Sequence, residues 1–230
     1  MGKRIISQAR GKGSLTYRVK KKAFTRKIGY PIKSGEAEIL KLVHSPAHTA
    51  PLMKLKLDKE IFYNPAFNGA FEGQKIMVEG EAKEGNILRL KDIPDGTRVY
   101  NIEKNPGDGG KMIRTAGSSS IVSKNQGAKA IITMANKKTV TLNSNCRATI
   151  GVIAGDGRTL KPLVTAGRKY YKMKARSKLW PRVSAVAMNA IDHPFGSGRG
   201  KRIKSKIAKR NAPPGRRVGH LRPKRTGCKK

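Results

Sequence analysis

The clearest structural signal in this chain is Leu52-Met53-Lys54-Leu55-Lys56-Leu57-Asp58-Lys59-Glu60-Ile61-Phe62-Tyr63-Asn64-Pro65. Apolar and charged residues alternate from Leu55 onward, which is typical of a strand with one buried face. Asp58-Lys59 makes a turn, and the chain returns through Ile61-Phe62-Tyr63 until Asn64-Pro65 ends the second strand. The stretch therefore predicts two adjacent β-strands.

Further short strands are expected downstream of this pair. Residues 74–79 and 87–90 are two more short candidate strands bounded by glycines, and with the first pair they predict a small barrel. Ile93-Pro94-Asp95-Gly96 is a turn signal that could begin a second module. Short strands at regular spacing predict a second barrel or sandwich there. The candidate strands of this module are residues 98–102, 120–123, 128–134, 139–142 and 148–153.

Charge divides the chain into three parts. The 230 residues hold 51 Lys and Arg against 14 Asp and Glu, a net charge of +37. Residues 1–33 contain 11 basic residues and no acid, residues 34–167 contain 19 against 13, and residues 168–230 contain 21 against Asp192 alone. Such a charge excludes most soluble enzymes and indicates a nucleic-acid partner. We therefore predict a basic N-terminal extension at 1–35, barrels at 36–93 and 94–167, and a basic C-terminal extension at 168–230.

The two extensions are expected to order on their ligand. They are rich in glycine and proline, as in residues 196–200 and 211–215, and cannot bury enough apolar area to offset the entropy of ordering the backbone. A free basic tail is the alternative, although apolar residues such as Trp180 and Phe195 indicate anchoring. One or two helical turns are expected over residues 168–178, ended by Pro181.

The sequence predicts neither a membrane span nor a secretion signal. The longest nearly apolar runs, such as residues 128–135, are far shorter than the ~18–20 residues that a spanning helix needs. The basic N-terminus leads into more charge rather than an apolar run. Cys146 and Cys228 have no local partner, so we expect reduced thiols without a zinc site or disulfide. A cytoplasmic protein without a cofactor or metal is expected.

Three motifs invite sharper hypotheses. The loop of residues 105–111 has three glycines beside Lys111, so its N–H groups could approach a phosphate, or it could be a plain inter-strand loop. His44 and His48 have helical spacing for a metal, but Pro46 stands between them. Asp192-His193-Pro194 resembles a hydrolase dyad, but no nucleophile motif accompanies it. An imidazole placed among nucleotides is the preferred interpretation, and a plain structural turn before Pro194 is the alternative.

Longer motifs give the chain a family resemblance. The series runs from Cys146-Arg147-Ala148-Thr149-Ile150-Gly151 through Trp180-Pro181 to Ala187-Met188-Asn189-Ala190-Ile191-Asp192-His193-Pro194-Phe195-Gly196, and ends with Asn211-Ala212-Pro213-Pro214-Gly215-Arg216. It resembles the universal "protein two" family of the large ribosomal subunit, and the archaeal branch most of all. The match extends in order over essentially the whole chain.

The resemblance implies a mainly β fold, with an OB-like barrel followed by an SH3-like barrel and long basic extensions. It implies a structural, non-enzymatic constituent of the large subunit that binds ribosomal RNA near the peptidyl-transferase centre and supports assembly, subunit association and translation. Its partners would be large-subunit ribosomal RNA, neighbouring ribosomal proteins and the small subunit at the interface. The protein would be ribosome-bound, and His193 would lie in the loop closest to the catalytic RNA.

Charge, loop chemistry and the resemblance together select the candidate RNA contacts. The basic clusters suit an irregular path along the phosphates of a folded RNA. The candidates are Arg10, Lys12, Lys20, Lys21, Lys22, Gly109, Lys111, Arg147, Arg168, Lys172, Lys174, Arg176, Trp180, Asn189, His193, Arg199, Arg202, Arg216, Arg217 and Arg225.

Two other classes remain open from composition. A DNA-compacting protein would use the same net charge, but duplex grooves are usually entered by a helix or a β-ribbon rather than by irregular arms. A metal- or histidine-dependent hydrolase acting on nucleic acid would need clustered acids, which the sequence lacks.

Overall fold

The structure, a computed structural model, describes residues 2–15, 17–196 and 207–222. The chain forms two compact units. The first, here called the barrel unit, spans Lys21–Val164. The second, here called the basic unit, combines Met1–Lys20 with Thr165–Lys230. The predictions for Arg199, Arg202, Arg225 and Cys228 lie outside the described residues.

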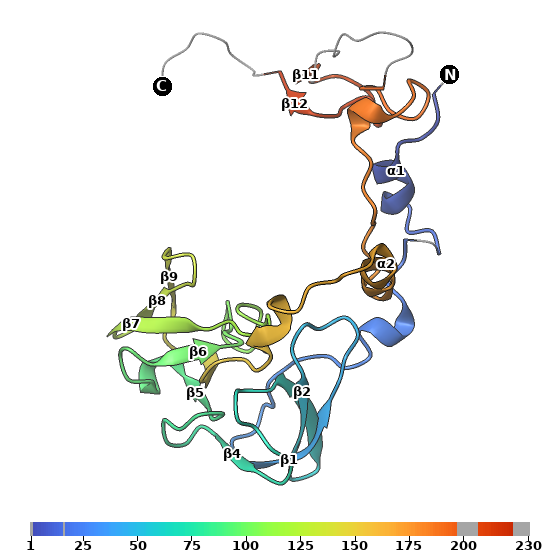
Figure 1. The fold of residues 1–230 in the computed structure, drawn as a ribbon. Coiled ribbons are helices and arrows are strands. Elements are labelled where there is room, and N and C mark those ends of the chain that lie inside the picture. Colours follow the sequence, from blue (N-terminus) through green and yellow to red (C-terminus); the bar gives the residue numbers. More distant parts are fainter. Residues whose placement is uncertain (1, 16, 197–206, 223–230) are drawn as a thin grey trace. The chain divides into compact units, whose positions relative to one another are not determined.

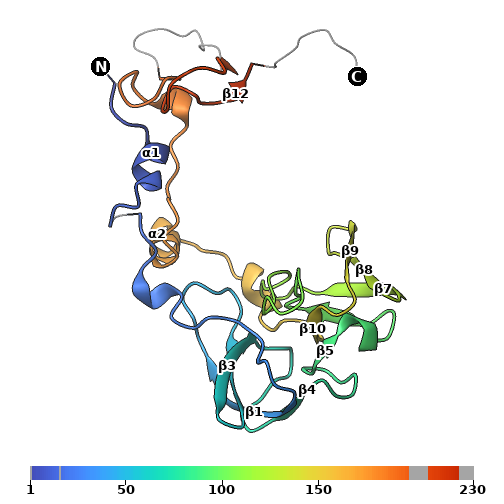
Figure 2. The same cartoon turned by 180° about the vertical axis from the view of Figure 1, so that it is seen from behind.

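The barrel unit is built on one ten-stranded sheet (Figure 1). Its strand order is β3-β2-β1-β4-β5-β10-β6-β7-β8-β9. Figure 2 shows β1, β3 and β4 gathered at one end of this unit and β7, β8 and β9 at the other. The strands are β1 (Gly35–Val43), β2 (Leu52–Leu57), β3 (Glu60–Pro65), β4 (Lys75–Val78), β5 (Ile87–Arg89), β6 (Arg98–Tyr100), β7 (Ser120–Gln126), β8 (Lys129–Thr133), β9 (Thr139–Asn143) and β10 (Arg147–Ile150).

The hairpin predicted around Asp58 is confirmed as β2 and β3. Leu57 pairs with Glu60 across the two-residue turn, and Asp58 takes a left-handed φ of 50° there. The alternation predicted from Leu55 onward is also observed, because Leu55 and Leu57 are buried while Lys56 is exposed. Strand β1 pairs with β2 and β4 but was not predicted. A register shift between Ile39 and Lys41 interrupts its period of two.

Two hydrophobic cores lie on this sheet and share its central strands. In β5, Ile87 belongs to the first core and Leu88 to the second. In β6, Val99 belongs to the second core and Tyr100 to the first. Because successive side chains of a strand point to opposite faces, β5 and β6 form a wall between the cores. The mainly β prediction, with an OB-like barrel followed by an SH3-like barrel, is confirmed.

A buried polar network lies where the two cores meet. The Tyr30 hydroxyl donates to the Asn101 carbonyl at 2.7 Å and lies 2.8 Å from the Thr149 hydroxyl. The Asn64 amide donates to Thr149 at 2.9 Å and accepts from the Asn101 amide at 2.8 Å. Burial raises the pKa of the Tyr30 phenol, so it stays a neutral donor. The barrel unit thus begins before the boundary predicted at residue 35, because Tyr30 is part of its core.

This placement predicts the behaviour of two fragments. Residues 21–164 should fold alone, whereas residues 34–164 should be less stable by about 3–5 kcal/mol, the usual cost of deleting a buried aromatic side chain. Urea denaturation followed by circular dichroism measures the difference. The Tyr30→Phe variant of the longer fragment is the control, since it keeps the ring and removes only the hydroxyl. Equal stability of the two fragments would exclude a structural role for residues 21–33.

The basic unit has little regular structure in its described part. It contains α1 (Ile6–Gly11), α2 (Ala166–Ala175), a 3-10 turn at Ala185–Ala187, and the two-stranded parallel sheet of β11 (Ile207–Ala208) and β12 (His220–Leu221). In both views the segment that follows α2 runs past α1 (Figures 1 and 2). A helix was predicted over residues 168–178, and α2 begins two residues earlier and ends before Ser177. No helix of the described part is long and apolar enough to cross a membrane.

The remaining short helical turns all belong to the barrel unit. They are the 3-10 turns Lys21–Ala23, Leu90–Asp92 and Asp156–Thr159.

Candidate nucleic-acid interface

Positive charge is concentrated in the basic unit. Its 27 Lys and Arg residues face one acid, Asp192, which gives a net charge of +26. The barrel unit holds the other 24 basic residues against 13 acids, a net charge of +11. The positive charges of the basic unit are dense enough to repel one another strongly. This unit therefore requires a polyanion or counterions for neutralisation.

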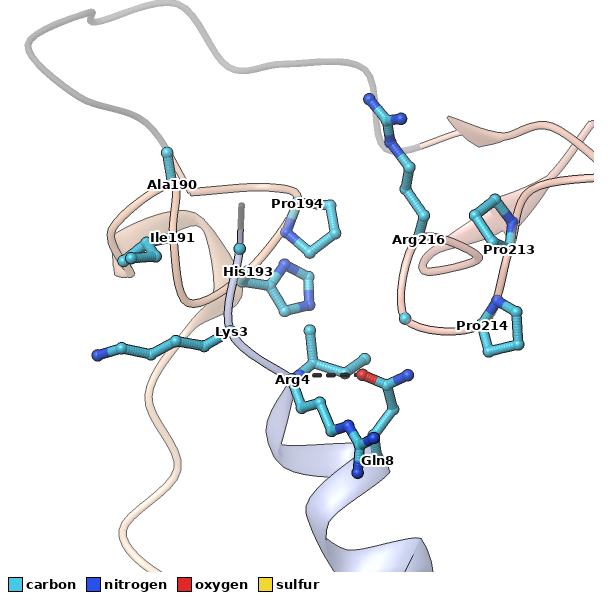
Figure 3. A pocket seen from close by; sticks show the side chains of 13 residues that line it. Lys3, Arg4, Gln8, Ala190, Ile191, His193, Pro194, Pro213, Pro214 and Arg216 are labelled. Atoms are coloured by element: carbon cyan, nitrogen blue, oxygen red, sulfur yellow. Dashed lines mark hydrogen bonds between the residues drawn. The ribbon is translucent and has the colours of Figure 1, made fainter.

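A pocket of about 600 Å³ opens within the basic unit around His193 (Figure 3). We call it the His193 pocket. Three segments line it: residues 2–8 at the start of the chain, residues 190–194, and the turn 213–216. Figure 3 shows the imidazole of His193 pointing into the space between Gln8 and the Pro213–Arg216 turn. Cations come to the pocket from two of these segments, as Lys3, Arg4 and Arg216.

The loop that carries His193 is shaped by the backbone of Asn189. The Asn189 carbonyl accepts the N–H groups of Asp192 at 3.0 Å and His193 at 3.3 Å, and Gly196 N–H donates to the His193 carbonyl at 2.8 Å. A Cβ on Gly196 would collide with the Asn189 carbonyl, so a glycine is required. The sequence motif therefore folds into a tight double turn that carries the imidazole at the His193 pocket.

Asp192, the single acid of the basic unit, pairs with Lys3 beside this pocket. The Asp192 carboxylate lies 3.7 Å from the Lys3 ammonium, and Lys3 N–H donates to the Ile191 carbonyl at 2.8 Å. Both side chains of the pair are largely exposed, so the pair contributes little stability. The Asp192 carboxylate is therefore paired with Lys3, and Arg4 and Arg216 leave the pocket with a positive charge.

The hydrogen bonding of His193 defines what the imidazole can do. Its Nδ1 accepts the N–H of Phe195 at 3.0 Å, so the neutral ring carries its proton on Nε2. That tautomer donates a hydrogen bond from Nε2 and cannot accept a proton there. The geometry therefore suits donation to an oxygen of a nucleotide. It gives no support to the Asp-His dyad of a hydrolase.

The glycine-rich loop of residues 105–111 uses its N–H groups internally. Gly107 and Gly109 donate to the Glu103 carboxylate at 3.2 and 3.0 Å. Gly110 donates to the Asp108 carboxylate at 3.1 Å. Two carboxylates thus occupy the places that a phosphate would take, and the inter-strand loop is the interpretation that fits. The N–H of Gly109, one of the predicted RNA contacts, thus has a partner inside the barrel unit.

Arg147 is likewise engaged within the barrel unit. Its guanidinium donates to the Pro31 carbonyl at 2.6 Å and to Glu103 at 3.3 Å, and it lies 5.3 Å from the ring centre of Tyr30. Its side chain is only 13% exposed. An RNA contact by Arg147 would require it to leave these partners, so its structural role is the one that the contacts describe.

The other candidates divide between the two units. Lys21, Lys22 and Lys111 belong to the barrel unit, where Lys21 and Lys111 are exposed and the side chain of Lys22 lies outside the described part. The remainder are exposed or half-buried in the basic unit: Arg10, Lys12, Lys20, Arg168, Lys172, Lys174, Arg176, Trp180, Asn189, Arg216 and Arg217.

Sequence reasoning missed Lys3, Arg4 and Gln8 of the His193 pocket. They lie in an acid-free N-terminal stretch, but only the fold brings that stretch to residues 190–194. A basic N-terminus by itself does not identify its neighbour.

The histidine pair and the described cysteine have structural surroundings. His48 Nδ1 lies 2.7 Å from the Ser45 hydroxyl, and its ring packs edge-on against Phe24 at 5.5 Å. Burial and the nearby Arg114 charge lower the pKa of His48. Cys146 lies in the second core, where burial raises the pKa of its thiol to about 11. Neither setting resembles a reactive site.

Comparisons with known proteins agree with this architecture. A family model described as ribosomal proteins L2, C-terminal domain, matches residues 83–215. The protein named large ribosomal subunit protein uL2 of Archaeoglobus fulgidus is 44% identical over the full length of both chains. The protein of the same name in Sulfolobus acidocaldarius is 41% identical, over 99% of this chain and 98% of its own. That of Methanocella arvoryzae is 43% identical over 99% of each.

The fold and the distribution of charge define a general class of protein. The chain is a two-barrel β protein with a second unit that combines an excess of positive charge with a largely irregular backbone. It belongs to the ribosomal protein L2 family. The resemblance to the archaeal branch is confirmed by the relatives just described.

Proposed function

We propose that the protein is a structural constituent of the large ribosomal subunit and binds ribosomal RNA near the peptidyl-transferase centre. The observation that carries the proposal is the basic unit, with 27 Lys and Arg against one acid. Its chain is largely irregular, and its His193 pocket combines Arg4 and Arg216 with an imidazole donor. Irregular basic segments of this kind follow the phosphates of folded RNA.

The first barrel, residues 36–93, suits the other partners of such a subunit. Residues 36–93 hold eight basic residues and nine acids, so this barrel lacks the charge excess of the basic unit. We assign it to contacts with neighbouring ribosomal proteins and to the support of subunit association. The protein is then bound to ribosomes in the cytoplasm, with RNA rather than protein as the catalyst.

The proposal is tested by sedimentation of the protein in a lysate. The full chain should sediment with large-subunit particles, and ribonuclease should release it, while deoxyribonuclease should not. Release by deoxyribonuclease would instead favour the DNA-compacting alternative. Purified full-length protein should also bind large-subunit RNA more tightly than duplex DNA of equal length at the same salt concentration.

A substitution at His193 separates positioning from catalysis. In fully assembled particles, His193→Gln should change single-turnover peptide-bond formation by less than about tenfold, because its Nε2 is a donor that glutamine partly replaces. Loss of a general base would cost about 10²–10⁴-fold. Assembly and subunit joining should suffer instead. His220→Gln, on exposed β12, is the matched control. A pH-dependent loss of several orders of magnitude in the chemical step would contradict positioning.

A further inference from the structure

We infer that a second pocket of the basic unit binds one unstacked base of single-stranded RNA. This pocket, here called the aromatic pocket, lies between the segment 17–20 and the C-terminal end of α2. The inference rests on the proposed RNA-binding function and adds to it a site, a ligand chemistry and the residues that recognise it. Ten described residues line the pocket: Leu15, Tyr17, Arg18, Lys20, Tyr170, Lys174, Ser177, Lys178, Leu179 and Trp180.

The aromatic pocket is held open by a serine at the end of α2. The N–H of Ser177 donates to the Lys174 carbonyl, and the N–H of Lys178 donates to the Met173 carbonyl at 3.0 Å. This pair of bonds is a Schellman ending, and it places Ser177 at a left-handed φ of 53°, where glycine is usual. The Ser177 hydroxyl then donates to the Arg18 carbonyl at 3.1 Å and accepts from Lys20 N–H at 3.2 Å.

These bonds explain why a serine occupies a glycine position. A glycine would relieve the backbone but would lose both bonds to the segment 18–20. The two hydrogen bonds of the Ser177 hydroxyl therefore fix Tyr17 and Arg18 on one side of the pocket. Tyr170 from α2 and Trp180 from the chain after it also line the pocket. Strained residues that persist in a fold are often those that shape a binding site.

The aromatic rings of the pocket are poised for stacking. The Lys169 ammonium lies 5.3 Å from the ring centre of Trp180, and Lys169 lines a neighbouring pocket of about 500 Å³ that shares Trp180. Lys169 does not line the aromatic pocket, so we assign it to the opposite face of the indole. The Lys174 ammonium lies 5.6 Å from the ring centre of Tyr170. Tyr170 and Trp180 are thus each paired with a cation, and aromatic rings accompanied by cations are used to stack the bases of single-stranded nucleic acid.

Charge and size select a nucleotide over an apolar ligand. Four of the ten lining residues are cations, namely Arg18, Lys20, Lys174 and Lys178, and none of the ten is acidic. The volume of about 430 Å³ is within the range of small-molecule sites, ~300–1,000 Å³. Aromatic platforms flanked by cations are the combination by which proteins hold single-stranded nucleic acid. A base would stack on Tyr170 or Trp180 while its phosphates meet the cations.

The chain carries its own probe for this event. Trp180 is the single tryptophan, so its fluorescence reports on the aromatic pocket of the full-length protein. The probes are a six-nucleotide single-stranded RNA and an abasic oligonucleotide of the same length, both at fixed salt concentration. Both carry the same phosphates. We expect the RNA to quench Trp180 strongly and to bind about 5- to 100-fold more tightly than the abasic strand.

Matched variants locate the base. Tyr170→Ala should weaken binding of the RNA about 5- to 100-fold and leave binding of the abasic strand unchanged. Tyr170→Phe keeps the ring and should bind like the unchanged protein. Phe71→Ala is the control, because Phe71 is an aromatic residue of the barrel unit that is 60% exposed and does not line the pocket. Circular dichroism of each variant checks that the fold is retained.

The outcomes distinguish this inference from the function on which it rests. Equal quenching by the RNA and the abasic strand, or equal losses in Tyr170→Ala and Phe71→Ala, would overturn the aromatic pocket as a base site. Binding of large-subunit RNA would then still stand. If the full-length protein bound neither oligonucleotide nor large-subunit RNA, the proposed function itself would fail, and the pocket with it.

Discussion

Raising the salt concentration from about 50 to about 200 mM should weaken binding of the full-length protein to large-subunit RNA by about 10³–10⁵. The reason is counterion release from the phosphates that the basic unit neutralises. Each contact contributes a slope of roughly −0.7 to −0.9 to the log–log plot, and about six to ten contacts are expected. Filter binding over this salt range measures the slope.

Two triple variants of equal charge test where those contacts lie. Replacing Lys12, Arg168 and Arg217 by Gln removes three exposed cations of the basic unit, and should lower the magnitude of the slope by about 2–3. Replacing Lys41, Lys56 and Lys59 by Gln removes three exposed cations of the barrel unit and should leave the slope nearly unchanged. Each triple lowers the net charge of the chain from +37 to +34. Equal slopes in the two variants would show that charge acts without regard to position.

The strands that sequence predicted are those whose signal is local. β2 and β3 combine an alternating pattern with a two-residue turn, and both features lie within residues 52–65. β1 also alternates, because Ala37 and Ile39 are buried while Glu36 and Glu38 are exposed. Alanine and glutamate are poor strand formers, and the register shift after Ile39 hides the period. Pairing with β2 and β4, rather than propensity, makes this segment a strand.

The parts of the site that sequence could not give depend on contacts between distant residues. The pocket around His193 joins residues 2–8, 190–194 and 213–216, and no periodicity connects such segments. The motif around His193 did locate the loop, but the tautomer follows only from the bond to Phe195. The glycine-rich loop was a reasonable phosphate site by composition. In the structure, the N–H groups of Gly107 and Gly109 donate to Glu103. Glu103 is buried, although its charge alone would predict a surface position.

The second large effect is expected at this carboxylate. Glu103 is fully buried and accepts four hydrogen bonds: from the N–H groups of Gly107, Gly109 and Arg147, and from the Arg147 guanidinium. Glu103→Gln keeps the shape but turns one acceptor into a donor that faces other donors. It also leaves the guanidinium buried without its counterion. Removing one partner of a buried ion pair costs about 3–5 kcal/mol.

Urea denaturation of residues 21–164 measures this loss. Circular dichroism is used to follow it, because the fragment lacks Trp180 and so has no tryptophan fluorescence. A whole domain has only about 5–15 kcal/mol of stability, so the variant should be close to unfolding at 37 °C. Glu79→Gln is the control, because Glu79 pairs with Arg89 at 2.8 Å while both side chains are partly exposed. That pair should contribute no more than about 1 kcal/mol. A loss at Glu103 as small as that at Glu79 would mean that the loop keeps its shape without the carboxylate, and its N–H groups could then serve a phosphate after all.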